Sequence, residues 1–466
     1  MPSATALSIA PAMTAIHILV IAVMLYLALL ALVGWRAGRG GSGRYRALRY
    51  GLSLATICTA WTYFAGVGGA GEGSWLFLAN ALGSVMAITL LRPVWRRIAV
   101  LSKQENVGSL ADFLAARFGK SRTLGVMVAA LAALGTLPYF ALQLEVLVDA
   151  AVLATGSGAP SPGARAGAAA ALVAALAAMA IGFGTQRPSL TQNNRGLVSI
   201  ISLEAVVKIA GLLAVAGLCL VLLGAASQGP LAGMPARFWA AMPSPADTSP
   251  GSFLMLALLC TITAFTVPRQ FHLGFVAIEA VEDVGPASVI LPLYFVLWVS
   301  ATLIIGTAMR AGLAVHGVAP VMQVLAIPLA HGAGAVALLA WLGGLSAGAA
   351  MVIVELTAIS GMLSNEIVLP LLRPLTNGGH RDVAVRIVRV RRLTVLAIAV
   401  LAWLYDVGMR GQNAPVQLGM TALAAFAQFS PPLLGGLWWR GGHARGAIAG
   451  IAVGFAVWAV AVVAPA

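Results

Sequence analysis

Long apolar runs separated by short polar loops organise the whole chain. A helix that crosses a bilayer needs about 20 consecutive, mostly apolar residues. Twelve segments have this character, so the pattern predicts about twelve transmembrane spans. They cover residues 15–35, 49–72, 76–100, 124–154, 166–185, 197–225, 252–270, 286–310, 334–371, 388–409, 415–438 and 444–464. The run at 334–371 is longer than one crossing needs, so we expect it to be tilted or to extend past the membrane.

The second span contains an unusual cluster of glycines. Five glycines fall in the eight positions from Gly66 to Gly73. Each interior glycine costs a helix about 1 kcal/mol relative to alanine, and an opened helix in a bilayer must find new partners for its backbone groups. Broken helices are how many secondary transporters hold substrate and ion. We therefore predict one wall of a binding site here. The open alternative is a glycine-rich, closely packed helix or a turn outside the membrane.

Composition places the chain among polytopic membrane proteins. Of its 466 residues, 60% are hydrophobic and only 9% are charged, which excludes a soluble enzyme. No catalytic constellation or nucleotide-binding loop is present, so we expect no enzymatic activity and no resident cofactor beyond a possible sodium ion. The net charge of +14 does not indicate a nucleic-acid partner, because the basic residues lie in the loops between spans.

The distribution of basic residues predicts the orientation. If the N-terminus lies outside, 23 of the 28 Lys and Arg residues fall in inside segments and only four in outside loops. An excess of Lys and Arg marks cytoplasmic loops. We therefore predict a multi-pass protein of the cytoplasmic (inner) membrane, in contact with the lipid bilayer, with both termini outside.

Two loops carry their own predicted structure. Ser109 can cap a short helix in the inside loop at 107–122, and the outside loop at 225–252 has room for a short surface helix. Because five spans invert a unit's orientation, residues 49–225 and 252–438 are predicted to be inverted repeats within one transmembrane domain. Residues 15–35 and 444–464 are then extra spans.

Several segments point to a known family. The run SLADFLAARFGKSR at 109–122 resembles a segment of the sodium:solute symporter family. The similarity continues in TLPYFALQLEVL (136–147), GFGTQR (182–187), VPRQFH (267–272), GLSAGAAMVIVELTAISGMLSNEIVLPLL (344–372) and LAAFAQFSPPLLGGLWWRGGHARGAIAGIAVGFAVW (423–458). It is strongest toward the symporter-like domain found at the N-terminus of some sensor histidine kinases.

The resemblance implies an all-α, leucine-transporter-like fold. Such a fold has two inverted five-helix repeats, and the first helix of each repeat is broken at the binding site. It also implies alternating access, with cation entry coupled to solute entry.

A sodium site is implied between two helices. The first-helix positions look like Ala55 and Cys58, whose backbone carbonyls would be ligands. The partner positions fall at Ala347, Ala350 and Met351, where coupled family members place Ser or Thr at the last two. Sodium needs oxygen ligands, so this departure leaves proton coupling open, with Ser346 the nearest hydroxyl.

Because the expected sodium ligands are missing, carboxylates inside the spans become candidates for carrying a proton. Such carboxylates are costly in a bilayer and often functional. Glu355 follows the altered sodium positions by about one turn and is a candidate proton carrier. The alternative is a carboxylate paired with an arginine or facing water. Glu204 is a candidate for the exit path, although Lys208 at i+4 allows a structural ion pair instead.

The predicted solute-binding residues are polar or aromatic and lie near the middle of the core spans. They are Trp61, Thr62, Tyr63, Asn80, Tyr139, Gln143, Thr263, Phe265 and Gln428. Arg269 and His272, at the inner end of their span, are expected at an inside gate rather than on the solute.

Two functions remain open from the sequence. The first is cation-coupled (sodium or proton) symport of a small polar organic solute such as an amino acid or organic acid. The second is a solute-sensing module that works with a separate histidine kinase as partner. Kinase-fused relatives carry a thirteenth span, whereas this chain ends after the twelfth predicted one.

Overall fold

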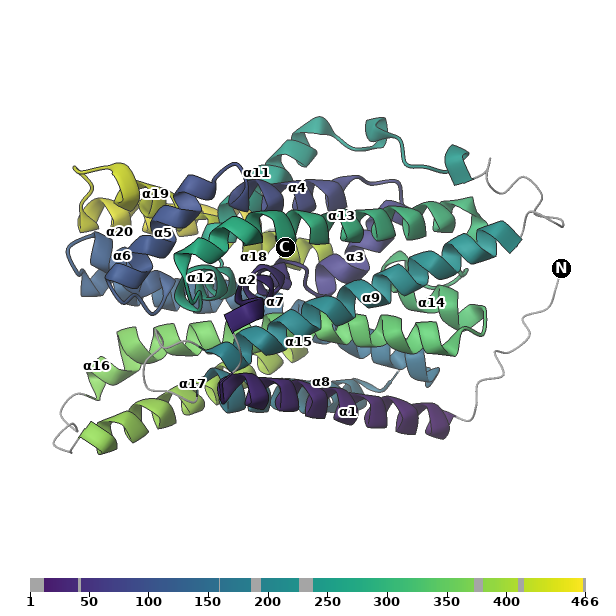
Figure 1. Cartoon of the computed structure of the whole chain (residues 1–466), viewed down its shortest axis with the longest axis horizontal. Helices are drawn as coiled ribbons and strands as arrows, with labels where there is room; N and C mark the ends of the chain where they lie inside the picture. The colour runs from purple at the N-terminus through teal and green to yellow at the C-terminus, as the bar shows by residue number, and fades with distance from the viewer. Residues whose placement is uncertain are drawn as a thin grey trace.

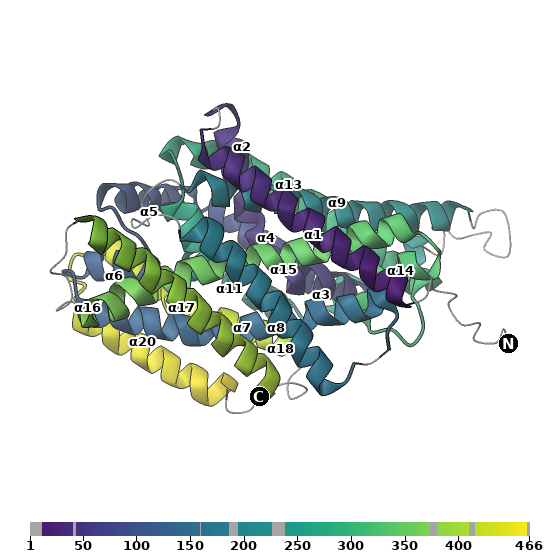
Figure 2. The ribbon, with the colours of Figure 1, turned by 90° about the horizontal axis from the view of Figure 1, so that it is seen from below.

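The computed structural model describes residues 12–40, 43–158, 160–185, 194–225, 238–372, 380–409 and 415–463. These residues form helices and loops without a strand. Figures 1 and 2 show α1, α7, α9, α13 and α15 running along the long axis, while α5, α6, α16 and α19 gather at one end. The arginine-rich segments around residues 92–97 and 117–122 belong to that end, which is the predicted cytoplasmic one.

The N-terminal half comprises α1 (Ala12–Gly38), η1 (Gly43–Tyr45), α2 (Arg46–Ser53), η2 (Leu54–Ile57), α3 (Ala60–Gly71), α4 (Leu76–Ile88), α5 (Arg92–Gln104), α6 (Leu110–Arg117), α7 (Arg122–Thr155), α8 (Pro162–Met179), η3 (Ala180–Gly184) and α9 (Arg195–Ala225). The next part comprises η5 (Pro245–Asp247), α11 (Pro250–Thr266), α12 (Pro268–Phe271), η6 (His272–Val276), η7 (Val281–Asp283), α13 (Val284–Ala308), η8 (Met309–Leu313), η9 (Pro320–Met322) and α14 (Gln323–Ala330). The last part comprises α15 (Gly334–Leu363), η10 (Ser364–Val368), α16 (Leu369–Leu371), α17 (His380–Met409), α18 (Pro415–Ala427), α19 (Ser430–Trp438), α20 (Ala444–Trp458) and η12 (Ala459–Val463).

Each predicted span coincides with one helix or with a pair of helices separated by a bend or break. By length and composition, seven described helices can cross a membrane, or up to nine if each bent pair is one span. The figure of about twelve spans stays a prediction. One of the bent pairs is α4 with α5, which meet at 58°.

The predicted break in the second span exists, but it precedes the glycines. Helical geometry ends at Ile57, Cys58 is extended (φ −75, ψ 93), and α3 starts at Ala60. The glycines from Gly66 to Gly71 lie inside the regular helix α3, and our expectation that they open the helix is wrong. Gly68 serves close packing instead, because a Cβ there would lie 2.8 Å from the backbone nitrogen of Val321.

A second break interrupts the seventh predicted span. Val267 is extended (φ −65, ψ 126) between α11 and α12. The following Pro268 explains this conformation, since proline disfavours helical geometry in the residue before it. Both breaks that the family resemblance implied are therefore present.

The helix α15 lies at the centre of the bundle. Of the residues in an 18-residue apolar stretch within Gly334–Leu371, which contains α15, 78% are buried inside the protein. Its small residues let neighbours approach closely: Gly343 lies against the Tyr63 ring and Gly344 against the Phe64 ring, both from α3. Close packing through small residues is the common way in which membrane helices associate.

The two loop predictions are confirmed in outline. The Ser109 hydroxyl accepts a hydrogen bond of 3.1 Å from the Asp112 amide and caps α6. In the outer loop, a helical turn at 238–240 and η5 are present, while residues 226–237 lie outside the described part.

Candidate functional site

A central cavity of about 350 Å³ lies beside α3. Exposed residues at its rim include Glu72 and Ser252, whereas Trp61, Thr62 and Asn80 are buried. The cavity therefore leads from the surface at the predicted outer end toward the break before α3. Its remaining lining is Ala65, Gly66, Gly69, Ser74, Leu76, Phe77, Met255, Leu256, Trp298 and Met420.

A second, much smaller cavity of about 20 Å³ shares Trp61, Thr62 and Asn80 with the first. It is polar on several sides, since Tyr139, Thr263 and other hydrogen-bonding groups line it. Its remaining lining is Ile57, Ser84, Cys260, Ala264, Val267, Arg269, Gln270 and Leu423. The two cavities together define the candidate site, which lies between the breaks of α2–α3 and α11–α12.

A buried ion pair lies at the small cavity, because Arg269, which lines it, is paired with Glu355. Arg269, directly after the second break, donates from Nη1 to Glu355 Oε2 at 3.1 Å, and both side chains are buried. Thr136 donates to the other carboxylate oxygen at 3.3 Å, and the Arg269 guanidinium lies 4.9 Å from the centre of the Tyr139 ring. Glu355 is thus paired with an arginine, the alternative that the sequence left open, and Arg269 belongs to the cavity lining.

Several buried donors around the cavities have no hydrogen-bond partner among the described residues. These are Trp61 Nε1, Arg269 Nε and Gln270 Nε2, and the Gln270 Oε1 acceptor is in the same state. A buried donor without a partner costs roughly 1–3 kcal/mol, so these groups favour a ligand or water that accepts hydrogen bonds.

The first break is satisfied on both sides by side chains. Lys208, buried on α9, donates from Nζ to the carbonyl oxygens of Ala55 at 2.7 Å and Cys58 at 2.8 Å. Across the break, the Ala60 amide donates to Gln143 Oε1 at 2.9 Å. A cation meets the carbonyl end of the first segment and an acceptor meets the amide end of the second, as helix dipoles favour.

The residues at the implied sodium position do not fit a sodium ion. Both carbonyls receive the Lys208 ammonium, and Ala350 and Met351 are fully buried without an oxygen on their side chains. The Ser346 hydroxyl donates to the Glu204 backbone carbonyl and accepts from Tyr26, each at 2.8 Å. Ala347, the remaining predicted residue, is also fully buried.

Glu204 does not form the ion pair with Lys208 that the i+4 spacing allowed. No such pair within 4.0 Å is present in the described part of the chain, and neither Glu204 carboxylate oxygen has a hydrogen-bond partner there. The Lys208 side chain turns to the break instead, where the Cys58 carbonyl has no other partner among the described residues and the Ala55 carbonyl has only the Cys58 amide.

The end opposite the cavity mouth is closed by aromatic packing and ion pairs. The Trp95 ring centre lies 5.2 Å from that of Phe265 and 4.7 Å from that of Phe275. Trp95 also donates to the Tyr50 hydroxyl, which donates to the Gly274 carbonyl. Two ion pairs lie at the same end, Arg46–Asp283 at 2.7 Å and Arg195–Glu279 at 2.8 Å.

The structure brings some predicted solute-binding residues to the cavities and leaves others apart. Trp61, Thr62, Asn80, Tyr139 and Thr263 line them. The other four lie elsewhere: Tyr63 donates to the Ala340 carbonyl, Gln143 caps the break, Phe265 packs on Trp95, and Gln428, directly after α18, donates to the Ala424 carbonyl of that helix.

Sequence reasoning missed parts of the lining. Trp298 and Met420 come from helices whose facing side is not visible in an all-apolar pattern. Arg269 was placed at an inner gate, but the break at Val267 directs it to the floor of the cavity. The signal available in the sequence was Pro268, which predicts an extended residue before it.

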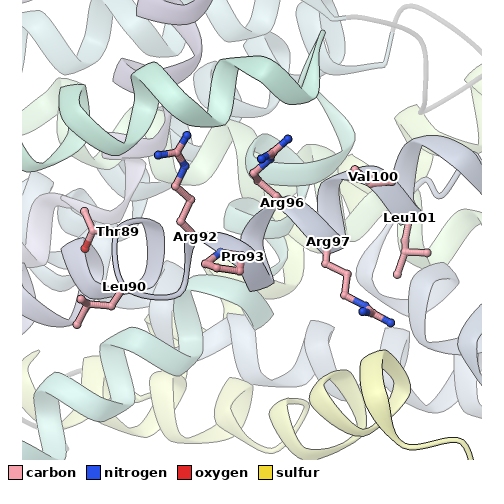
Figure 3. A pocket seen from close by; sticks show the side chains of 8 residues that line it. All are labelled: Thr89, Leu90, Arg92, Pro93, Arg96, Arg97, Val100 and Leu101. Carbon is pink, nitrogen blue, oxygen red and sulfur yellow. The ribbon is translucent and has the colours of Figure 1, made fainter.

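A separate open hollow of about 850 Å³ lies at the bend between α4 and α5. Figure 3 shows Arg92 and Arg96 pointing to one side of α5 and Arg97 to the other. Arg97 donates to the Leu437 carbonyl at 2.8 Å and lies over the Trp438 ring. Arg97 thus connects α5 to α19 at the basic end of the molecule, away from the central cavity.

Comparison with solved structures identifies the fold. The chain superposes on a Na⁺-coupled sialic acid symporter, described in a substrate-bound outward-open state, with a TM-score of 0.67 and 15% identity over 95% of this chain and 91% of that one. A manganese transporter of Eremococcus coleocola matches with a TM-score of 0.43 and 14% identity, over 91% of this chain and 95% of that one. No family model matches the chain. No curated protein matches it in sequence.

The first likeness, at this low identity, shows the fold alone. The chain is an all-α, multi-pass protein of leucine-transporter-like fold, as the sequence predicted. The two broken helices and the cavity between them occupy the place where this fold holds its ligands.

Proposed function

We propose that the chain is a secondary active transporter that carries a small polar organic solute, such as an amino acid or an organic acid, through the cytoplasmic membrane by alternating access. The central cavity between two broken helices is the main support, because it reaches one end of the bundle and is closed toward the other. A volume of about 350 Å³ suits a small organic molecule.

The chemistry of the cavity floor supports the solute class. Trp61, Arg269 and Gln270 offer buried donors that lack partners among the described residues, and a carboxylate accepts several hydrogen bonds. Arg269 already shares its charge with Glu355, so it contributes to the solute mainly as a hydrogen-bond donor. Carboxylate-bearing and hydroxyl-bearing solutes therefore fit better than cationic ones.

The coupling cation in this proposal is a sodium ion or a proton. The sialic acid symporter of the same fold is Na⁺-coupled, which supports sodium. A coupling sodium ion would have to bind away from Ala55 and Cys58, whose carbonyls are engaged. For a proton, Glu355 and Glu204 remain the proposed carriers or exit-path residues.

Ligand-dependent stabilisation tests the proposal. The purified protein is melted with a panel of amino acids and organic acids, in sodium and in choline buffers, and stabilising compounds are then assayed for uptake into proteoliposomes. A ligand at one hundred times its dissociation constant stabilises the folded state by about 2.7 kcal/mol. Thr62→Val and Trp61→Phe should weaken binding of the active solute at least about tenfold, since each loses a polar group at the cavity.

Thr155→Val is the matched control for Thr62→Val. The Thr155 hydroxyl donates within its own helix at the far end of α7, outside both cavities, so its loss should leave solute binding unchanged. Solute binding without any uptake under a sodium or proton gradient would contradict the transporter assignment.

A further inference from the structure

The break before α3 creates a position that calls for a positive charge. Where a helix ends, its last carbonyl oxygens lose their partners and carry the negative end of the dipole. In hydrocarbon such groups must be satisfied internally. The Cys58 carbonyl is one of these groups, while the Ala55 carbonyl already accepts a hydrogen bond of 3.0 Å from the Cys58 amide and has a second lone pair free for another donor. The segment that carries both carbonyls, η2 and the residue after it, lies between α9 and the central helix α15.

Lys208 meets this need with its whole side chain buried. It is 1% exposed, and its Nζ lies 2.7 and 2.8 Å from the two carbonyl oxygens. These distances are those of charge-assisted hydrogen bonds. An ion that used the same two carbonyls would have to displace the ammonium group or lie beside it, where like charges repel each other strongly in a medium of low dielectric constant.

The facing wall offers nothing to a diffusible cation. Ala347, Ala350 and Met351 present methyl groups and a thioether, whereas a hard cation requires several oxygen ligands. The nearest hydroxyl, Ser346, is already bonded to Glu204 and Tyr26. An ammonium group that makes its own bonds to the carbonyls needs no ligand from this wall.

Two other charged side chains lie near this position. Glu204 precedes Lys208 by one helical turn on α9, and its carboxylate oxygens have no hydrogen-bond partner among the described residues. Arg269 has its own carboxylate partner in Glu355.

We propose that Lys208 is the resident cation of this site: its tethered ammonium group takes the place of the sodium ion that the fold family would put there. Solute binding next to the break then requires no sodium ion at this position. The inference refines the coupling ion of the proposed transporter. Its first test needs no solute, so the failure of the transport proposal would be recognised separately.

The experiment compares the full-length protein with Lys208→Ala and Lys208→Met. Each is melted in choline chloride, in sodium chloride and with added propylammonium. Wild type should melt at the same temperature with and without propylammonium, because its own ammonium group occupies the position. Loss of the ammonium group leaves the Cys58 carbonyl without a partner, so both variants should melt at least about 5 °C lower in choline. Propylammonium, which needs no oxygen ligand from α15, should restore Lys208→Ala, where space is open, more than Lys208→Met, where a longer side chain fills it, and sodium should restore neither beyond any effect it has on wild type.

The solute provides a second readout that a merely structural lysine would not move. Binding of an active solute should be indifferent to propylammonium in wild type, and should become dependent on it in Lys208→Ala. Lys208→Arg, which keeps a cation, covers the case in which the alanine variant does not fold: it should bind solute without propylammonium.

Two results would overturn the proposal. One is a folded Lys208→Met protein that melts like wild type in choline, because the carbonyls would then not need the ammonium group. The other is a folded Lys208→Ala protein that melts like wild type in choline and does not respond to propylammonium.

Discussion

At the scale of single residues, buried polar side chains work in pairs whose partners come from distant helices. Glu355 on α15 and Arg269 on α12 are 3.1 Å apart and buried. Removing one partner of such a pair leaves an uncompensated charge and typically costs about 3–5 kcal/mol. We expect Glu355→Gln to lower the melting temperature strongly, and the double variant with Arg269→Met to recover part of the loss. Additive losses in this double-mutant cycle would show that the two residues do not act as a pair.

Gln143 is the second residue with a testable role, because its side-chain oxygen accepts from the Ala60 amide at the start of α3. Gln143→Leu leaves that amide without an acceptor and should destabilise the protein by about 1–3 kcal/mol. Gln428→Leu is the matched control, since the Gln428 amide donates to the Ala424 carbonyl of the helix directly before it and caps no break. Thermal unfolding in detergent measures the loss of stability in both variants, and the loss should be larger in Gln143→Leu. Equal losses would contradict the capping role.

At the scale of elements, the glycines of α3 do not open the helix. Gly68 lets α3 pack closely against η9, and Gly66 and Gly69 line the central cavity. A Cβ on Gly68 would lie 2.8 Å from Val321 N and 3.0 Å from the Pro320 carbonyl carbon, which are backbone atoms, whereas a Cβ on Gly69 would first meet an atom at 3.9 Å. Alanine in place of glycine favours a helix by about 1 kcal/mol. We therefore expect Gly69→Ala to be neutral or stabilising and Gly68→Ala to be destabilising, as measured by melting temperature. A stable Gly68→Ala protein would contradict close packing of α3 on η9.

At the scale of the whole molecule, the cavity reaches one end of the bundle while the other end is held shut. Alternating access requires the closed end to open, which breaks contacts such as Arg46–Asp283. Asp283→Asn should weaken this closure and shift the population toward a state open at the basic end. Cys260 lines the small cavity and is a buried free thiol, so its labelling by a thiol reagent from that end should become faster in the variant.

Asp149→Asn is the control for the closed end, since it removes the ion pair with Arg165 on the other side of the predicted membrane. It should leave labelling from the basic end unchanged. Unchanged labelling in Asp283→Asn as well would mean that this ion pair does not hold the closure.

The sequence by itself determined the architecture at the level of helices. Apolar runs place the elements within a few residues, because the cost of polar groups in hydrocarbon acts on every residue of a span. The basic loops gave an orientation that stays a prediction. The family resemblance placed Ala55 and Cys58 at a backbone site, and their carbonyls lie at the break. The expectation of polar or aromatic residues near the middle of the core spans selected Trp61, Thr62 and Asn80, which line both cavities.

Only the tertiary structure decided which partner each polar group has. The i+4 spacing allowed Glu204 and Lys208 to pair, but Lys208 bonds to the break carbonyls instead. The glycines looked like the site of the opening, yet the break lies before Ala60, and Gly68 packs against η9. Arg269 lines the cavity because a distant carboxylate on α15 holds it there. Such choices depend on which unsatisfied group lies nearest in space, and the order of residues along the chain does not contain that distance.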